Sequence, residues 1–303
     1  MVDALKSLLY AEASRPWTFL ELGFWIFFAV VLVGFAGLER RLALRNTYLM
    51  LASWFFYYHT SQWYVVLLIC TTAVDYGVGH ALHRTQRNLL RKLLLAISII
   101  SNLGVLFFFK YAYFVAEVWN DLTGLAWSPT PFWAGWANGQ LGTNFVEDVI
   151  LLPVGISFYT FQLVGFAVDT LIRREPLPRW FDFLNFAGFF PQIVAGPIER
   201  REALLPQIEG FRLRWSAADI DAGFRWMALG LFFKCALADN LAAQFHRGPS
   251  TNAYQIWLAN GIFGLRIYYD FAGYSLIAVG IARCLGIRLS LNFLSPYCAT
   301  GTA

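Results

Sequence analysis

Long apolar stretches separated by short polar breaks run through most of the chain. The first, residues 19–37, is long enough to cross the hydrocarbon core of a bilayer as a helix, at about 1.5 Å per residue. Residues 47–58 and 63–79 predict a hairpin of two rather short helices, because only residues 59–62 separate them. Residues 93–109 predict the next span. The pattern indicates an all-α protein whose helices pass through a membrane.

The second half of the chain alternates in the same way, but its apolar stretches are interrupted. Residues 146–172 predict a span with Pro153 inside it, and such a proline kinks a helix and frees a carbonyl group that neighbouring protein must satisfy. Residues 181–198 are short and broken by prolines, so we expect a re-entrant or interfacial segment. Residues 222–237 predict another span, and residues 254–286 predict two short helices.

Composition supports the same class of protein. Hydrophobic residues make up 58% of the 303 residues and charged residues 14%, whereas soluble domains have about 25% charged residues. A soluble core could not bury this much apolar surface, so a bilayer must cover the rest. The four cysteines stand in or beside apolar stretches without paired spacing, which predicts small buried side chains rather than a disulfide framework or a zinc site.

The basic residues predict which helix ends face the cytoplasm. No Lys or Arg occurs between Lys110 and Arg173. Because cytoplasmic loops collect Lys and Arg, the Trp-rich loop at 120–144 is expected outside, along the lipid headgroups. The basic clusters are expected inside, near anionic lipids, and their alternation with apolar spans disfavours a nucleic-acid groove. They are Arg40, Arg41 and Arg45; Arg84, Arg87, Arg91 and Lys92; Arg173, Arg174 and Arg179; and Arg200, Arg201, Arg212 and Arg214.

Two charged residues stand inside an apolar stretch. Arg266 and Asp270 both fall within residues 254–286. A charge at membrane depth is costly and by default marks a substrate pathway or a site. The alternative is that the two residues, four apart on one helical face, simply pair with each other.

The histidines predict little chemistry. His80 and His83 are three apart, a spacing that can ligate a metal on a helix, but no third ligand follows and a solvated loop is the favoured interpretation. His59 and His246 stand alone in predicted outer loops. Sequence signatures of nucleotide-binding loops, zinc proteases and serine hydrolases do not occur in the chain. No metal site is therefore expected.

Five motifs occur in a fixed order along the chain, and together they resemble those of the membrane-bound O-acyltransferase family. The similar branch is the bacterial one that includes alginate O-acetyltransferases and the teichoic-acid D-alanyl transfer protein. The resemblance covers roughly residues 40–300. The motifs are LPVGISFYTFQ at 152–162, FFPQIVAGPIER at 189–200, GLFFK at 230–234 with ADN at 238–240, IYYDFAGYS at 267–275, and NF at 292–293 with PY at 296–297; FKY at 109–111 fits the same branch.

The resemblance implies an enzyme of the bacterial inner membrane that crosses it many times. Such an enzyme moves an acyl group, acetyl for the alginate enzymes, from a cytoplasmic donor to hydroxyls of an extracytoplasmic polysaccharide or cell-wall polymer. The donor would be acetyl-CoA or an acyl-carrier protein acting as a co-substrate, with no bound cofactor. Membrane lipid and an accessory periplasmic or membrane acyltransferase are the further expected partners, and nucleic acid is not.

In this family the reaction takes place in a tunnel through the membrane, which the two substrates enter from opposite faces. A broken segment at membrane depth and an intramembrane acid fit such a polar passage. The residues expected to line it are Arg266, Tyr269, Asp270, Gly273, Tyr274, Pro191, Gln192, Gly196, Pro197 and Asn292.

One departure from the family pattern concerns catalysis, and a second concerns the polar contacts at one turn. The family's two histidine motifs have no counterpart before Ala303, and Ser290 and Leu291 stand where the branch usually has Pro and Glu. A histidine can take the proton of the attacking hydroxyl. We therefore expect residues 1–303 to form one membrane domain, the N-terminal part of the fold, cut from a longer protein and inactive alone. A naturally short, non-catalytic relative is the alternative.

Two other function classes remain as alternatives. A transporter or flippase for a lipid-linked sugar would also use broken helices and intramembrane charges. It predicts an internal repeat, which the two halves do not show. A structural subunit of a polysaccharide export complex would need no buried acid.

Overall fold

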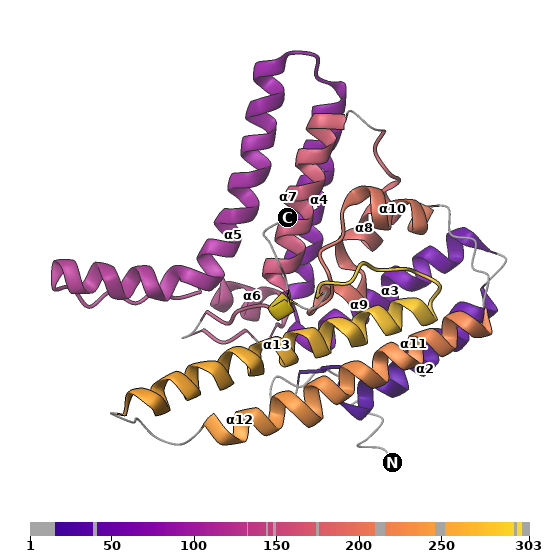
Figure 1. The fold of residues 1–303 in the computed structure, drawn as a ribbon. Coiled ribbons are helices and arrows are strands. Elements are labelled where there is room, and N and C mark those ends of the chain that lie inside the picture. Colours follow the sequence, from indigo (N-terminus) through magenta and orange to yellow (C-terminus); the bar gives the residue numbers. More distant parts are fainter. Residues whose placement is uncertain are drawn as a thin grey trace.

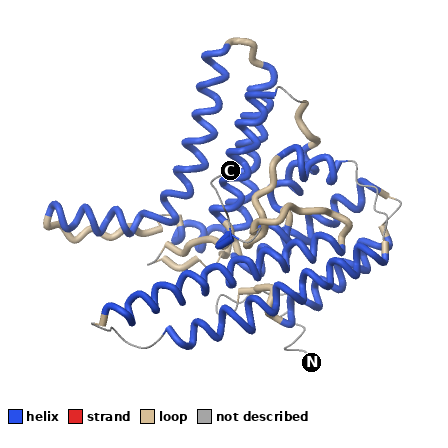
Figure 2. The backbone as a smooth tube through the Cα atoms, viewed as in Figure 1, coloured by secondary structure: helices blue, strands red, loops and turns tan. Residues whose placement is uncertain are grey.

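The computed structural model describes residues 16–38, 41–131, 133–143, 145–147, 150–173, 176–209, 216–245, 252–293 and 296–298. Within these ranges every regular element is a helix (Figure 2), which confirms the predicted all-α class. The helices are α2 (Leu22–Gly37), α3 (Leu42–Ser61), α4 (Tyr64–Arg84), α5 (Asn88–Thr123), α6 (Ala134–Leu141), α7 (Ile156–Arg173), α8 (Trp180–Gly188), α9 (Phe190–Ile193), α10 (Arg201–Glu209), α11 (Ala217–Leu231), the π-helix η1 (Phe232–Ala238), α12 (Asp239–Phe245), α13 (Ala253–Cys284) and the short 3₁₀ turn η2 (Pro296–Cys298).

Helices α4, α5 and α7 lie side by side and form one group (Figure 1). The 36 residues of α5 correspond to about 54 Å, more than the roughly 30 Å hydrocarbon core. Figure 1 shows the second part of α5 turning away from α4 and α7. The outward face of α5 is apolar along the helix, with Ile100 70% exposed and Phe114 62% exposed. Across the described ranges, α4, α5 and the continuous helix Ala217–Ala243 are long and apolar enough to cross a membrane.

The second group is a helix pair whose backbones approach closely. α11, η1 and α12 follow one another without a break and run alongside α13 (Figure 1). Gly223 faces Gly280, and Gly230 faces Gly273. A Cβ atom added to any of these four would come within 2.6–2.9 Å of the carbonyl oxygen of the facing glycine. Small residues at both surfaces are what allow two membrane helices to pack backbone against backbone.

The broken segment at 181–198 joins the two groups. α8 packs against α3 and α4, whereas α9 packs against α3 and α13. Phe190 of α9 lies 5.4 Å from Phe27 and 5.9 Å from Phe56 between ring centroids, and all three rings are buried. Such aromatic contacts add to the apolar burial that holds the helices together. As predicted, the helix breaks near its middle, because Phe189 separates α8 from α9 and Pro191 occupies the first turn of α9.

Two predicted spans have different bounds in the structure. α7 begins only at Ile156, so Pro153 precedes the helix instead of kinking it. Gly155 has a φ of 73°, which a continuing helix cannot use, and a Cβ there would lie 2.0 Å from the Ile193 carbonyl oxygen. Residues 254–286 form one helix rather than two. It ends where Gly286, with a φ of 77°, turns the chain.

The predicted loops are shorter than expected. Residues 59–61 belong to the end of α3, so His59 is helical and buried rather than in an outer loop. α5 continues to Thr123, and α6 forms inside the predicted loop at 120–144. His80 and His83 lie on the last turns of α4 rather than in a loop. The prediction of buried cysteines holds for Cys284 and is wrong for the other three, which are exposed.

Candidate functional site

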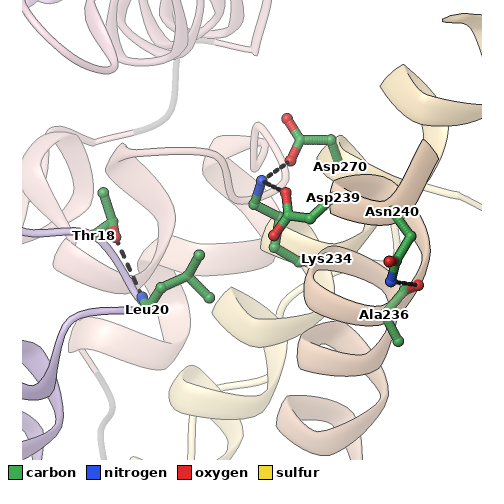
Figure 3. Close-up of polar contacts among 7 residues, drawn as sticks. All are labelled: Thr18, Leu20, Lys234, Ala236, Asp239, Asn240 and Asp270. Carbon is green, nitrogen blue, oxygen red and sulfur yellow. Dashed lines mark hydrogen bonds and ion pairs between the residues drawn. The ribbon is translucent and has the colours of Figure 1, made fainter. Parts of the chain in front are cut away.

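Three charged side chains meet where η1 lies against α13. Lys234 Nζ is 2.7 Å from Asp239 Oδ1 and 2.8 Å from Asp270 Oδ1, and Figure 3 shows the amine reaching toward both carboxylates. The Lys234 side chain is only 15% exposed, whereas those of Asp239 and Asp270 are 50% and 46% exposed. We call these three residues the Lys234 cluster. With both acids ionised, it carries one net negative charge.

The π-helix explains how Lys234 reaches Asp239. A π-helix repeats its backbone hydrogen bonds every five residues, and the Asp239 N–H donates to the Lys234 carbonyl oxygen. The acid five residues after the lysine therefore comes to lie next to it. One residue further, Asn240 Nδ2 donates to the Ala236 carbonyl oxygen at 2.7 Å (Figure 3). π-segments inside α-helices occur frequently at functional sites.

The glycine pairs explain how Lys234 reaches Asp270 across the interface between η1 and α13. Gly273 follows Asp270 by three residues, and Gly230 precedes Lys234 by four, so each charged residue lies about one turn from a glycine of the same pair. A Cβ atom at Gly273 would lie 2.9 Å from the Lys234 backbone nitrogen and 3.1 Å from its Cβ. Gly273, predicted to line a passage, therefore also holds the two charged helices together.

Aromatic rings surround the Lys234 cluster. Lys234 Nζ lies 5.7 Å from the centre of the Tyr274 ring, a distance at which the amine is attracted to the ring face. The Tyr269 ring packs against Phe233 at 5.3 Å. Phe271 contacts Phe158 of α7 at 5.9 Å. The cluster is thus a polar spot in an apolar and aromatic setting.

This arrangement can bind groups that donate hydrogen bonds. Lys234 is held between two anions, which offsets the cost of placing its charge among apolar side chains. Each carboxylate uses one oxygen for Lys234 and is about half exposed, so it can accept further hydrogen bonds. Hydroxyl groups are suitable donors, and hydrogen bonds to ionised carboxylates are stronger than those between neutral groups.

The structure corrects the alternative that Arg266 and Asp270 of α13 simply pair with each other. Asp270 pairs with Lys234 of η1, and among the described residues Arg266 forms no ion pair with it. The physical reason is the close approach of the two helices at their glycines, which brings a better-placed cation to Asp270. Asn292, another predicted lining residue, donates through Nδ2 to Ser275 Oγ at 3.1 Å beside a small cavity of about 30 Å³.

The predicted lining residues of the broken segment lie in the interior. Gln192 Nε2 donates to Gln162 Oε1 at 2.6 Å, and Gln162 Nε2 donates to the Phe186 carbonyl oxygen at 2.7 Å. Pro191, Gly196 and Pro197 are buried beside them. The structure thus groups Tyr269, Asp270, Gly273 and Tyr274 around Lys234 and places the broken segment apart, in a separate polar network. That these residues line one passage stays a prediction.

A cavity of about 1000 Å³ lies at the start of α3, the loop before α8 and α10. Arg179, Arg201, Asp182 and Glu209 contribute its charged lining. Burial raises the pKa of the Glu209 carboxyl, and the charge of Asp182 acts in the same direction, while the two arginines lower it. The sequence signals that we used did not point to this cavity.

Lys234 and Asp239 are the functional candidates that the search for intramembrane charge missed. Lys234 ends the apolar stretch 222–237, where a lysine is normally interpreted as reaching for the membrane interface. The signal that could have found them is a lysine in one apolar helix and an acid in the next, each one turn from a glycine. Neither residue alone carries that information.

A helical fold, helices long and apolar enough to cross a bilayer, and outward faces rich in large apolar side chains define a membrane protein. A partly exposed charged cluster between two of its helices is a candidate site for a polar group. The comparisons with known proteins narrow this class to a family.

No protein-family model matches the sequence. Curated relatives include a peptidoglycan O-acetyltransferase of Helicobacter pylori, 28% identical over 89% of this chain and 55% of the relative. A probable alginate O-acetylase AlgI of Pseudomonas aeruginosa is 31% identical over 84% of this chain and 46% of the relative. A teichoic acid D-alanyltransferase of Streptococcus thermophilus is 27% identical over 48% of this chain and 37% of the relative.

The chain therefore belongs to the membrane-bound O-acyltransferase family, as its motifs predicted. It spans about half the length of the curated relatives that it matches over most of its own residues.

Proposed function

We propose that the chain forms the membrane part of an O-acyltransferase that acylates hydroxyls of an extracytoplasmic polymer. Relatives named for acetylating peptidoglycan or alginate and for transferring D-alanine to teichoic acid support this reaction class. The observation that carries the proposal is the Lys234 cluster. Its two half-exposed carboxylates suit the binding of acceptor hydroxyls in an otherwise apolar bundle.

The acyl donor is proposed to be a cytoplasmic thioester, acetyl-CoA or an acyl-carrier protein. The large cavity with Arg179 and Arg201 lies on the side where the basic clusters are expected. The exposed guanidinium group of Arg179 suits a donor that carries phosphate. We further propose a bacterial inner-membrane location with several spans, which the apolar helices support, and the participation of an accessory acyltransferase as a partner.

The general base is proposed to lie beyond residue 303, in the histidine motifs that the family resemblance implies. Acyl transfer to a hydroxyl needs a group that takes its proton. The described histidines are poorly placed for this role. His59 is buried and stacks on Trp17 at 4.1 Å, and His80 Nδ1 lies 3.3 Å from the Tyr76 carbonyl oxygen. His246 lies outside the described residues.

The test separates binding of the acceptor from stabilisation of the helix pair. In the protein extended to include the histidine motifs, Asp270→Asn is expected to lower acyl transfer to the polymer, because it removes a charged hydrogen-bond acceptor. The triple variant Asp270→Asn, Asp239→Asn and Lys234→Met removes all three charges of the cluster and hence the cost of an unpaired one. It should restore protein levels in the membrane without restoring acyl transfer.

Acylation of the polymer is measured with a labelled donor and divided by the amount of folded enzyme. Asp221→Asn serves as the control, because Asp221 pairs with Arg225 on the exposed surface of α11, where ion pairs contribute little. Full acyl transfer by the triple variant would show that the cluster is structural and would remove the main support for the proposal. Loss of polymer export with unchanged acylation would favour the transporter instead.

A further inference from the structure

A second acid, Asp75, lies deep between α4 and α5 and has two neutral partners. The Ser98 hydroxyl is 2.5 Å from Asp75 Oδ1, and Asn102 Nδ2 donates to Asp75 Oδ2 at 2.7 Å. Asp75 is 1% exposed, Ser98 is fully buried and Asn102 is 2% exposed. The three side chains therefore touch one another and are closed off from solvent. None of them belongs to the Lys234 cluster or to the family motifs.

The position of Asp75 along the hairpin places it near the middle of a bilayer. It precedes Thr85, the first residue after α4, by ten positions, and Ser98 follows Asn88, the start of α5, by ten. At 1.5 Å per residue both lie about 15 Å from the hairpin turn. This distance is about half of the roughly 30 Å hydrocarbon core, if the basic turn marks one membrane surface.

Two charged groups on the helices packed against α4 have partners other than Asp75. Arg91 of α5 donates to the Leu171 carbonyl oxygen at 2.6 Å, and Asp182 of α8 accepts from Asn46 at 2.8 Å. Further titratable groups on these helices include Arg45 and His59 of α3, Tyr76 and His80 of α4, and Asp169 and Arg173 of α7. Within the described part of the chain, Asp75 forms no ion pair.

We propose that the hairpin of α4 and α5 contains a proton-binding site, and that Asp75 holds a proton there at neutral pH. An ionised carboxylate at this depth, with no cation beside it, is among the costliest groups that a membrane helix can bury. In the neutral form, Asp75 Oδ1 carries the proton and donates it to Ser98 Oγ across the short 2.5 Å contact. Oδ2 is then a carbonyl oxygen that accepts from the Asn102 amide.

When the acid is neutral, both oxygens of Asp75 keep a hydrogen-bond partner. The Ser98 hydroxyl becomes free to donate to the backbone carbonyl one turn earlier, a bond that serines in helices commonly make. Loss of the proton would leave a carboxylate with two neutral donors in an apolar surrounding. The packing of α4 against α5 therefore depends on the bound proton. The Lys234 cluster differs, because its acids have a cation.

Infrared spectroscopy tests the protonation state directly. The 303-residue chain is placed in lipid nanodiscs at neutral pH with ¹³C-labelled aspartate, and the spectrum of Asp75→Asn is subtracted. We expect a carbonyl band of a protonated carboxylic acid that shifts with the label and is absent from the variant. A difference spectrum that contains only carboxylate bands would overturn the proposal. Asp121→Asn, on the outer part of α5, should remove only a carboxylate band.

Two further measurements cover the case in which Asp75→Asn does not fold. Ser98→Ala removes the acceptor of the proton, so the acid band should move in frequency while persisting. Unfolding of the wild type should also depend on pH, because the folded state keeps a proton that the unfolded acid releases. Its unfolding constant should rise by up to about tenfold per pH unit above the ordinary carboxyl pKa. Asp121→Asn should keep this slope, and a wild type without any slope would contradict the proposal.

Discussion

Adding one methyl group at Gly230 should separate the two helices that hold the Lys234 cluster. In Gly230→Ala, the new Cβ would lie 2.6 Å from the Gly273 carbonyl oxygen and 2.7 Å from Ile277 Cγ1. Ordinary van der Waals contact begins at 3.4 Å, so α11 and α13 must move apart by about 0.8 Å. Both neighbours belong to helix α13, and the Gly273 oxygen is backbone, so it cannot turn aside like a flexible side chain.

The cost follows from two opposing effects. Overpacking of a close interface costs typically 1–3 kcal/mol, whereas alanine in a helix is more stable than glycine by roughly 0.5–1 kcal/mol. The net expectation for Gly230→Ala is a destabilisation of about 1–2 kcal/mol. A separation of this size would also lengthen the 2.8 Å contact between Lys234 and Asp270. Acyl transfer should therefore fall together with stability.

Gly261→Ala is the matched control, because it lies on the same helix α13 and nothing lies within 4 Å of an added Cβ atom. It should be neutral or stabilising by up to about 1 kcal/mol. The free energy of unfolding of both variants is measured in detergent micelles under the same conditions. If Gly230→Ala proves as stable as Gly261→Ala, the two backbones are not in contact in the folded protein, and the role assigned to the glycine pairs is wrong.

Two further predictions concern orientation and charge. In a cysteine-free background, an impermeant maleimide in intact cells should label a cysteine at Gly139, in the loop expected outside, and not one at Asn88; the reverse result would invert the topology. Glu209→Gln should raise the melting temperature at neutral pH and have no effect at acidic pH. The raised pKa of Glu209 means that its ionised form is disfavoured in the folded chain and that this cost disappears as the carboxyl is protonated. A lower melting temperature at neutral pH would contradict this reasoning.

Hydropathy located the helices better than it located their ends. The apolar stretches at 47–58 and 63–79 do become α3 and α4, and 222–237 does become part of a continuous helix. The errors arose where helices continue beyond the apolar stretch, as α5 does up to Thr123. A polar residue such as Glu117 extends a helix about as readily as Leu or Met does, so a decrease in hydropathy does not mark the end of a helix.

The candidate site was predictable only in part, because it depends on which helices pack against each other. Asp270 was recognised from its charge within an apolar stretch, but the one pairing considered for it was with Arg266 on the same helix. Pairing with Lys234 requires the approach of α11 and α13, which rests on four glycines that are far apart in sequence. Asp75 was missed for a similar reason. One acid inside α4 has no evident role until α5 places Ser98 and Asn102 beside it.

The polar side chains of the bundle are stabilised in different ways, and these decide which of them can act on a substrate. Arg201 is 5% exposed and donates to Thr170 Oγ1 and to the Pro176 carbonyl oxygen, so its donors are used within the protein. The Gln192 amide nitrogen likewise donates to another glutamine within the protein. Lys234 is satisfied too, but the two acids that bind it each keep about half of their surface open. A hydroxyl can approach those acids without breaking an existing bond, and for this reason the acceptor is expected to bind at the Lys234 cluster rather than at the more deeply buried polar groups.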